Sequence, residues 1–183
     1  MPDACTGRGG EQLEKQLAEF ITQRTVIVGM GSRQKGDDGL GPAVIEGLEG
    51  TIPLTLIDAG TSPENSTQNI VSYKPDTVLF IDAADIGKKP GEMALYRVDE
   101  IMDVGIGTHT GNVSLLEQYI HSITEAECLF LLVQPADVKY RGDLSADGEG
   151  TEELCLSPAA VEAVKHICVI IVSLFGSKRT DKV

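Results

Sequence analysis

The amino-acid sequence predicts a single α/β domain with a mostly parallel five-stranded sheet and helices on both faces. Its length of 183 residues is that of one domain. Apolar, strand-like runs alternate with helix-like segments, which is typical of parallel sheets covered by helices. With 42% hydrophobic and 23% charged residues, the chain also has the composition of a protein that buries a full core.

The first part of the chain predicts a helix, a strand and a second helix. Apolar residues recur at helical spacing between Glu11 and Gln23. The β-branched run Thr25–Met30 predicts a buried strand that breaks into a glycine turn. This turn carries two adjacent acids, Asp37 and Asp38, to the start of a helix expected from about Asp38 to Leu48.

The middle of the chain predicts three more strands. The run Thr51–Asp58 is expected to be the second strand, and it ends in the loop AGTSPENST. A short helix near Thr67–Tyr73 leads to the third strand, Thr77–Asp82. After a turn-rich connection, Met93–Val98 is expected to be a fourth strand at an edge of the sheet.

The last part predicts two helices around a buried strand. After the loop DVGIGTHTG, a helix is expected at Asn112–Ile123 and a strand at Glu127–Gln134. Residues 136–153 are polar and Gly-rich, which indicates a long surface loop. Ser157 is a suitable helix N-cap, so it begins a last helix that runs to Phe175. Residues 176–183 are expected to be a frayed tail.

Charge and composition narrow the possible partners. The formal net charge of −13 argues against nucleic acid or an anionic membrane, because both would repel the chain. The four cysteines lack CxxC spacing, and Cys128 and Cys168 lie in apolar runs, so we expect reduced core thiols in the cytoplasm. No signal core is present, and the longest apolar run, Ile167 to Phe175, is shorter than the roughly 20 residues that span a bilayer.

The glycines of the first turn suggest nucleotide binding, but the pattern is incomplete. Gly29 and Gly31 supply two positions of a dinucleotide fingerprint, while Gln34 occupies the third. Asp37 and Asp38 would lie where the pyrophosphate must bind, and like charges repel there. No Walker loop, no GxSxG serine and no cysteine with an evident base occurs. Nucleotide binding therefore stays a less favoured alternative.

Three ionisable residues are expected at one edge of the sheet. Asp38 follows the first strand, Asp82 ends the third, and His109 precedes a helix. If the strand order is 2-1-3-4-5, the first and third strands are neighbours with ends about 5 Å apart, so their acids can share one cation. Two carboxylates and an imidazole would leave coordination positions open. Asp37 can instead cap its helix, and His109 can be an ordinary loop histidine. His121 and His166 are interpreted as structural.

Six motifs in chain order resemble those of the [NiFe]-hydrogenase maturation proteases. They read VGMGSRQKGDDGLGP, IDAGTSPEN, LFIDAADIGKKPGE, THTGNVSLL, LLVQP and LSPAA, and they extend from about Thr25 to Phe175. The PEN loop and the DD pair are closer to the formate-hydrogenlyase type than to the membrane-uptake type. Ser32 stands where the family usually has Asn, and residues 1–24 form an N-terminal helical extension. The resemblance thus implies one family domain over residues 1–183.

The resemblance implies an endopeptidase that removes a C-terminal extension from a hydrogenase large-subunit precursor after nickel insertion. The precursor's cysteines hold the nickel, which the protease recognises through Asp38, Asp82 and His109. Asp58 and Glu64 are weaker candidates for positioning peptide or water, or else serve as turn and cap residues. We expect nickel-assisted peptide hydrolysis. A non-catalytic, nickel-sensing chaperone for the precursor is the alternative from another class.

Overall fold

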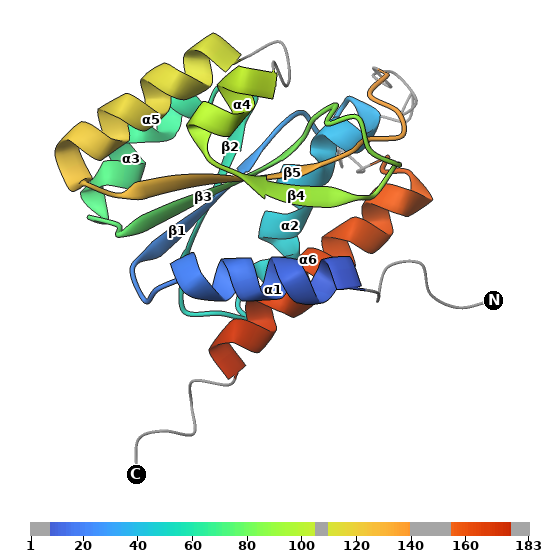
Figure 1. Ribbon diagram of the computed structural model, residues 1–183, viewed down its shortest axis with the longest axis horizontal. Coiled ribbons are helices and arrows are strands. Elements are labelled where there is room, and N and C mark those ends of the chain that lie inside the picture. Colours follow the sequence, from blue (N-terminus) through green and yellow to red (C-terminus); the bar gives the residue numbers. More distant parts are fainter. Residues whose placement is uncertain (1–7, 105–109, 140–154, 177–183) are drawn as a thin grey trace, which may run out of the picture.

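A five-stranded sheet forms the centre of the molecule, and helices cover both of its faces (Figure 1). The computed structural model describes residues 8–104, 110–139 and 155–176. The strands are β1 (Thr25–Met30), β2 (Thr55–Gly60), β3 (Thr77–Ala83), β4 (Met93–Tyr96) and β5 (Glu127–Val133). The α-helices are α1 (Arg8–Phe20), α2 (Leu40–Leu48), α3 (Thr67–Ser72), α4 (Val98–Val104), α5 (Thr110–Thr124) and α6 (Pro158–Gly176). Two short 3-10 helices, η1 (Gly36–Gly39) and η2 (Pro63–Ser66), precede α2 and α3.

The strand order is β2-β1-β3-β5-β4, with β4 antiparallel to β5 and all other pairs parallel. The prediction that the first and third strands are neighbours is confirmed. The predicted order 2-1-3-4-5 is wrong for the last two strands. A parallel neighbour needs a crossover of about a dozen residues or more, and the connection between β3 and β4 is shorter. The strand β4 therefore runs antiparallel at the edge, and β5 takes the place beside β3.

Two predicted elements differ from the structure, and one helix was not predicted. The second strand begins at Thr55 rather than Thr51. The helix expected from Asp38 is divided into η1 and α2. The helix α4 was missed, although Glu100 accepts a hydrogen bond from the Arg97 N–H at 2.7 Å, as in a capping box.

Alternating side chains of the central strands build two apolar layers. In a strand, successive residues point to opposite faces, so β1, β3 and β5 contribute to both layers. The layer that α1, α2 and α6 cover includes Ile27 and Ile81. The opposite layer, under α3, α4 and α5, contains Phe80 stacked on Phe130 at a centroid distance of 4.9 Å. Cys128 is buried in this layer as predicted.

The helix α6 (Pro158–Gly176) extends beyond the apolar run Ile167 to Phe175. Its stretch Pro158–Phe175 is long and apolar enough to cross a membrane by length and composition alone. The apolar run Ile167 to Phe175 is shorter, as predicted, but the helix that contains it reaches this length. A core helix can have the same composition, and one side of α6 packs into the core through Ala160, Ala163, Ile167, Ile170 and Ile171. Cys168 is only half-buried on this helix.

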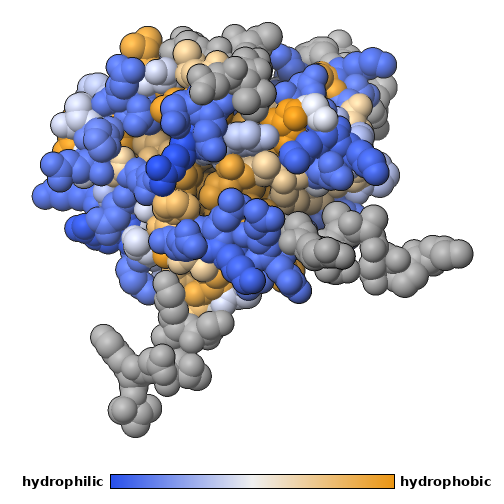
Figure 2. All heavy atoms as spheres, viewed as in Figure 1, coloured by the Kyte–Doolittle hydropathy of each residue, from blue (hydrophilic) through white to orange (hydrophobic). Residues whose placement is uncertain are grey.

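The N-terminal helix α1 is part of the same core. Leu13 and Leu17 are buried against the layer that α2 and α6 share. On the face shown in Figure 2, apolar side chains are visible between α1 and the edge of the sheet, and hydrophilic side chains surround them. The described part of the N-terminal extension, which contains α1, is therefore packed on the domain.

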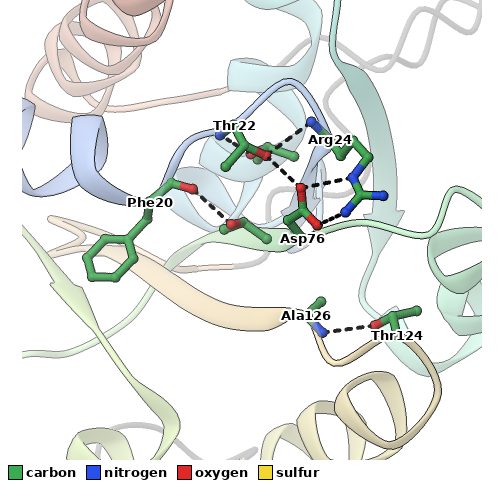
Figure 3. A network of polar contacts seen from close by, with 8 residues as sticks. Phe20, Thr22, Arg24, Asp76, Thr124 and Ala126 are labelled. Atoms are coloured by element: carbon green, nitrogen blue, oxygen red, sulfur yellow. Dashed lines mark hydrogen bonds and ion pairs between the residues drawn. The ribbon is translucent and has the colours of Figure 1, made fainter.

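A polar network fixes the end of α1 to the amino ends of the strands (Figure 3). The hydroxyl of Thr77 donates to the Phe20 carbonyl at 2.8 Å. Arg24 pairs with Asp76, whose backbone N–H donates to the Arg24 carbonyl at 3.1 Å. These residues lie at the edge opposite the carboxyl ends of the parallel strands, so this network supports the fold and lies away from the predicted site.

Candidate functional site

Two glycines bring the start of α2 onto the ends of β1 and β3. A Cβ atom at Gly41 would lie 2.2 Å from the Met30 carbonyl oxygen and 2.6 Å from that of Ile81. A Cβ atom at Gly29 would lie 2.5 Å from the Gly41 carbonyl oxygen. Only glycine permits backbones to approach this closely. The helix η1, which carries Asp38, is thereby placed over the carboxyl edge of the sheet.

A tight loop orients Asp38. Its Oδ2 accepts a hydrogen bond from the backbone N–H of Ser32 at 2.8 Å. Gly31 has a φ of +116°, and a Cβ atom there would lie 1.8 Å from the Asp38 carbonyl oxygen. Because the Ser32 contact uses the backbone, the Ser side chain at this position leaves the orientation of Asp38 intact.

Asp82 lies at the carboxyl end of β3, next to β1. Burial, first, and the nearby Asp38 carboxylate, second, together raise the pKa of Asp82 to about 7, while the Ala83 N–H that donates to it at 2.8 Å acts in the opposite direction. The structure thus brings two predicted site residues, Asp38 and Asp82, within electrostatic reach of each other. A buried carboxylate that lies close to a second carboxylate is also suited to share a cation with it.

Asp37 points away from Asp38 and into the protein. It is 1% exposed, and its carboxylate accepts hydrogen bonds from the backbone N–H groups of Ala136 at 2.7 Å, Asp137 at 3.2 Å and Ser157 at 2.6 Å. The Ser157 hydroxyl also donates to it at 2.9 Å. The expected role as a cap of its own helix is wrong, because Asp37 instead joins the segment after β5 to the start of α6.

The third predicted metal ligand, His109, lies outside the described residues. It directly precedes Thr110, the first residue of α5. Within the described ranges, no group of three His, Cys, Asp or Glu side chains is arranged to hold a metal ion. A metal held by Asp38 and Asp82 would have two oxygen ligands from them and would need further donors.

Asp58 faces a neighbouring cavity rather than the Asp38–Asp82 pair. Its Oδ2 accepts from Arg33 Nη2 at 2.7 Å, and its Oδ1 accepts from the Gly60 N–H at 3.1 Å. Arg33 also pairs with Glu46, and the two acids, Asp58 first, raise the pKa of Arg33. The cavity has a volume of about 250 Å³ and is lined by Gly31, Ser32, Arg33, Gln34, Pro42, Asp58, Gly60 and Thr61. The sequence did not lead us to expect that Arg33 pairs with Asp58, although an arginine close to Asp37 and Asp38 indicates an ion pair.

Glu64 lies in η2 and lines a different cavity, between α3 and α5. Its carbonyl accepts from the Thr67 hydroxyl at 2.6 Å, which is the turn role considered from the sequence. His121 Nδ1 lies 3.1 Å from the Ala126 carbonyl oxygen at the end of α5, in agreement with a structural role. Neither residue joins the pair of aspartates.

Comparisons with known proteins agree with this architecture. A sequence model of the hydrogenase maturation protease family matches residues 42–149, a range that includes Asp82 and His109 and begins just after Asp38. The hydrogenase 3 maturation protease of Escherichia coli K12 is 33% identical over 120 residues, which are 63% of this chain and 75% of that protein. A Methanocaldococcus jannaschii protein named for the same activity is 32% identical over 128 residues, covering 64% and 76% of the two chains.

Solved structures show the same fold. A [NiFe] hydrogenase maturation protease from Thermococcus kodakarensis superposes with a TM-score of 0.75 at 24% identity, over 90% of this chain and 99% of the other. The crystal structure of a hydrogenase 3 maturation protease gives a TM-score of 0.65 at 26% identity, over 79% and 86% of the two chains.

Proposed function

The chain belongs to the hydrogenase maturation protease family, and we propose that it removes the C-terminal extension of a [NiFe]-hydrogenase large-subunit precursor after nickel insertion. Membership in the family makes the protein an endopeptidase of hydrogenase maturation. The dependence on nickel, the roles of individual residues and a cytoplasmic location are part of the proposal.

The observation that carries the proposal is the pairing of Asp38 and Asp82 above neighbouring strands. Burial, first, and the charge of Asp38, second, raise the pKa of Asp82 to about 7, and a cation bound between the two carboxylates would relieve their repulsion. The nickel of the precursor is such a cation, and it arrives as part of the substrate. Asp38 and Asp82 would each contribute an oxygen, His109 an imidazole nitrogen, and the precursor's cysteines the remaining ligands.

Binding at this site would orient the scissile peptide bond over the edge of the sheet. Nickel can polarise the scissile carbonyl or lower the pKa of a bound water. Water then adds to the carbonyl carbon, the C–N bond breaks, and the products are a carboxylate and a free amine. Asp38 remains fixed throughout by the Ser32 N–H, so the chain supplies a preorganised carboxylate at the reacting centre.

The test is incubation of the purified protein with nickel-loaded and nickel-free precursor, followed by mass spectrometry. We expect the nickel-loaded precursor alone to lose its C-terminal extension. Equal cleavage of both forms would refute recognition through nickel. A stable complex without any loss of mass would instead indicate the non-catalytic chaperone.

Substitution of the aspartates tests their roles in the same assay. Asp38→Asn and Asp82→Asn should each reduce cleavage by at least about 100-fold, because each removes a charged oxygen ligand. Asp85→Asn is the matched control, since Asp85 follows Asp82 closely but is exposed and only accepts from the Gly87 N–H at 3.1 Å. Full activity of Asp82→Asn would remove that residue from the site.

A further inference from the structure

An apolar groove lies between α3 and α5, on the side of the sheet opposite α6. It has a volume of about 510 Å³ and is lined by Glu64, Thr67, Gln68, Leu115, Leu116 and Tyr119. Gln68 Nε2 donates to the Tyr119 hydroxyl at 2.6 Å and so joins the two helices across it. Leu116 is buried beneath. The volume falls in the range of about 300–1,000 Å³ that is usual for ligand sites.

The wall that α5 contributes is unusually apolar for an exposed helix face. Leu115, Tyr119 and Ile123 follow each other at intervals of four residues, so they lie on one face of the helix. Their exposed fractions are 66%, 41% and 52%. A continuous apolar stripe of this kind, beside a groove, marks an interaction surface more often than scattered single residues do.

The groove begins at the edge of the sheet that carries Asp38 and Asp82. Glu64 and Thr67 lie at the junction of η2 and α3, which directly follows the carboxyl end of β2, and β2 pairs with β1 up to Gly60. The helix α5 starts after His109, so its first turns also begin near this edge. A peptide that occupies the groove is therefore led towards the two aspartates.

The charge of the groove restricts its occupant. Glu64 is the only lining residue with a side chain charged at neutral pH, and its carboxylate accepts no hydrogen bond within the part of the chain that the structure describes. The whole chain carries a formal charge of −13. An acidic segment is therefore disfavoured, and an apolar segment without acids near Glu64 fits the lining.

We propose that the groove between α3 and α5 binds apolar side chains of the large-subunit precursor, in the segment that flanks the scissile bond. This inference rests on the proposed function, because that function names the precursor as the substrate. The groove then acts as a docking site that holds the chain on one side of the cut, while the aspartates engage the nickel.

The test compares Leu115→Ser with Val169→Ser on cleavage of nickel-loaded precursor and on its binding, measured separately by interferometry. Val169 is a matched control because it is also 66% exposed and helical, but it lies on α6. A contact made equally in the bound and transition states affects KM alone. We expect Leu115→Ser to raise KM and Kd about tenfold at unchanged kcat, and Val169→Ser to change neither. Leu115→Lys, which keeps a good helix former, should repeat the effect if the serine variant loses stability.

The outcomes separate this inference from the proposed function. If the wild-type protein cleaves the precursor and Leu115→Ser has the same KM and Kd as Val169→Ser, the docking site is refuted. The proposed protease function is then unaffected. If the wild-type protein binds the precursor without cleaving it, the proposed protease function is refuted. The Kd values of the two variants would still show whether the precursor binds in the groove. A dimer that dissociates in Leu115→Ser, with KM unchanged, would show that a second copy of this chain occupies the groove, against the proposal.

Discussion

Two adjacent acids have different roles because their side chains leave the backbone in different directions. Asp37 is enclosed and accepts hydrogen bonds from three backbone N–H groups and a hydroxyl. Asp38 is half-buried, and its charge contributes to the raised pKa of Asp82. The sequence predicted such a division, with Asp38 on the cleft side, but it assigned Asp37 to its own helix. Its partners lie about 100 residues further along the chain, where no local pattern indicates them.

Asp37→Asn should destabilise the protein severely. The amide offers one acceptor oxygen where the carboxylate offers two, so buried N–H groups lose partners at a cost of about 2–4 kcal/mol. Urea denaturation at pH 7 measures the change in the free energy of unfolding. Asp76→Asn, at an exposed ion pair, is the control and should have a much smaller effect. Equal losses in both variants would contradict the role assigned to Asp37.

Asp82→Asn should stabilise the nickel-free protein at neutral pH. The folded pKa of Asp82 is about 7 against an unfolded value of 3.8, so ionisation of the folded state costs stability as pH rises between these values. Below pH 4 both states are protonated and the variant has no advantage. At pH 8 we expect the variant to be more stable by about 2–4 kcal/mol.

Thermal unfolding of wild type and Asp82→Asn at several pH values, with a chelator present, measures this difference. Curves that stay parallel from pH 4 to pH 8 would show that Asp82 carries no raised pKa. If Asp82→Asn is more stable at neutral pH and also loses cleavage, Asp82 is a residue that is kept for function at the expense of stability.

The helix α2 requires glycine at position 41, where it crosses the ends of β1 and β3. Alanine normally stabilises a helix by about 1 kcal/mol relative to glycine, but at Gly41 a Cβ atom would meet backbone carbonyls of β1 and β3. Gly41→Ala should therefore lower the melting temperature and displace η1, with loss of cleavage. Gly47→Ala in the same helix is the control, because its Cβ would meet only the Cys168 side chain. A Gly41→Ala variant as stable as wild type would refute this packing argument.

The elements that the sequence predicted well are those with a strong local signal. The strands β1, β3 and β5 are nearly continuous apolar runs, and Ser157 and Pro158 mark the start of α6. The position of β4 was predicted as an edge, but its direction and partner were not. Both depend on the length of the preceding connection and on β5, which follows later in the chain. Among the side chains of the short helix α4 whose burial is described (residues 98–102), only Ile101 is fully buried, so the periodic signal is weak.

At the scale of the whole molecule, the N-terminal extension belongs to the core. Leu13 and Leu17 of α1 are buried together with side chains of α2 and α6. Removal of residues 1–21 takes away Leu13, Leu17 and Ile21 and should cost about 4.5–9 kcal/mol, at about 1.5–3 kcal/mol for each buried large apolar side chain. Calorimetry of the truncated chain measures the loss. A truncated protein with the melting temperature of the full chain would show that α1 is dispensable for folding.

The sequence by itself determined the α/β architecture, the neighbouring positions of the first and third strands, and the family. Periodicity, caps and motifs are local, and parallel strands bring their carboxyl ends to one edge whatever the rest of the chain does. Only the tertiary structure decided that Asp37 holds α6, that Asp58 pairs with Arg33, that β4 runs antiparallel, and that α3 and α5 enclose a groove. Each of these features is a contact between segments far apart in sequence, and its free energy arises only when packing brings them together.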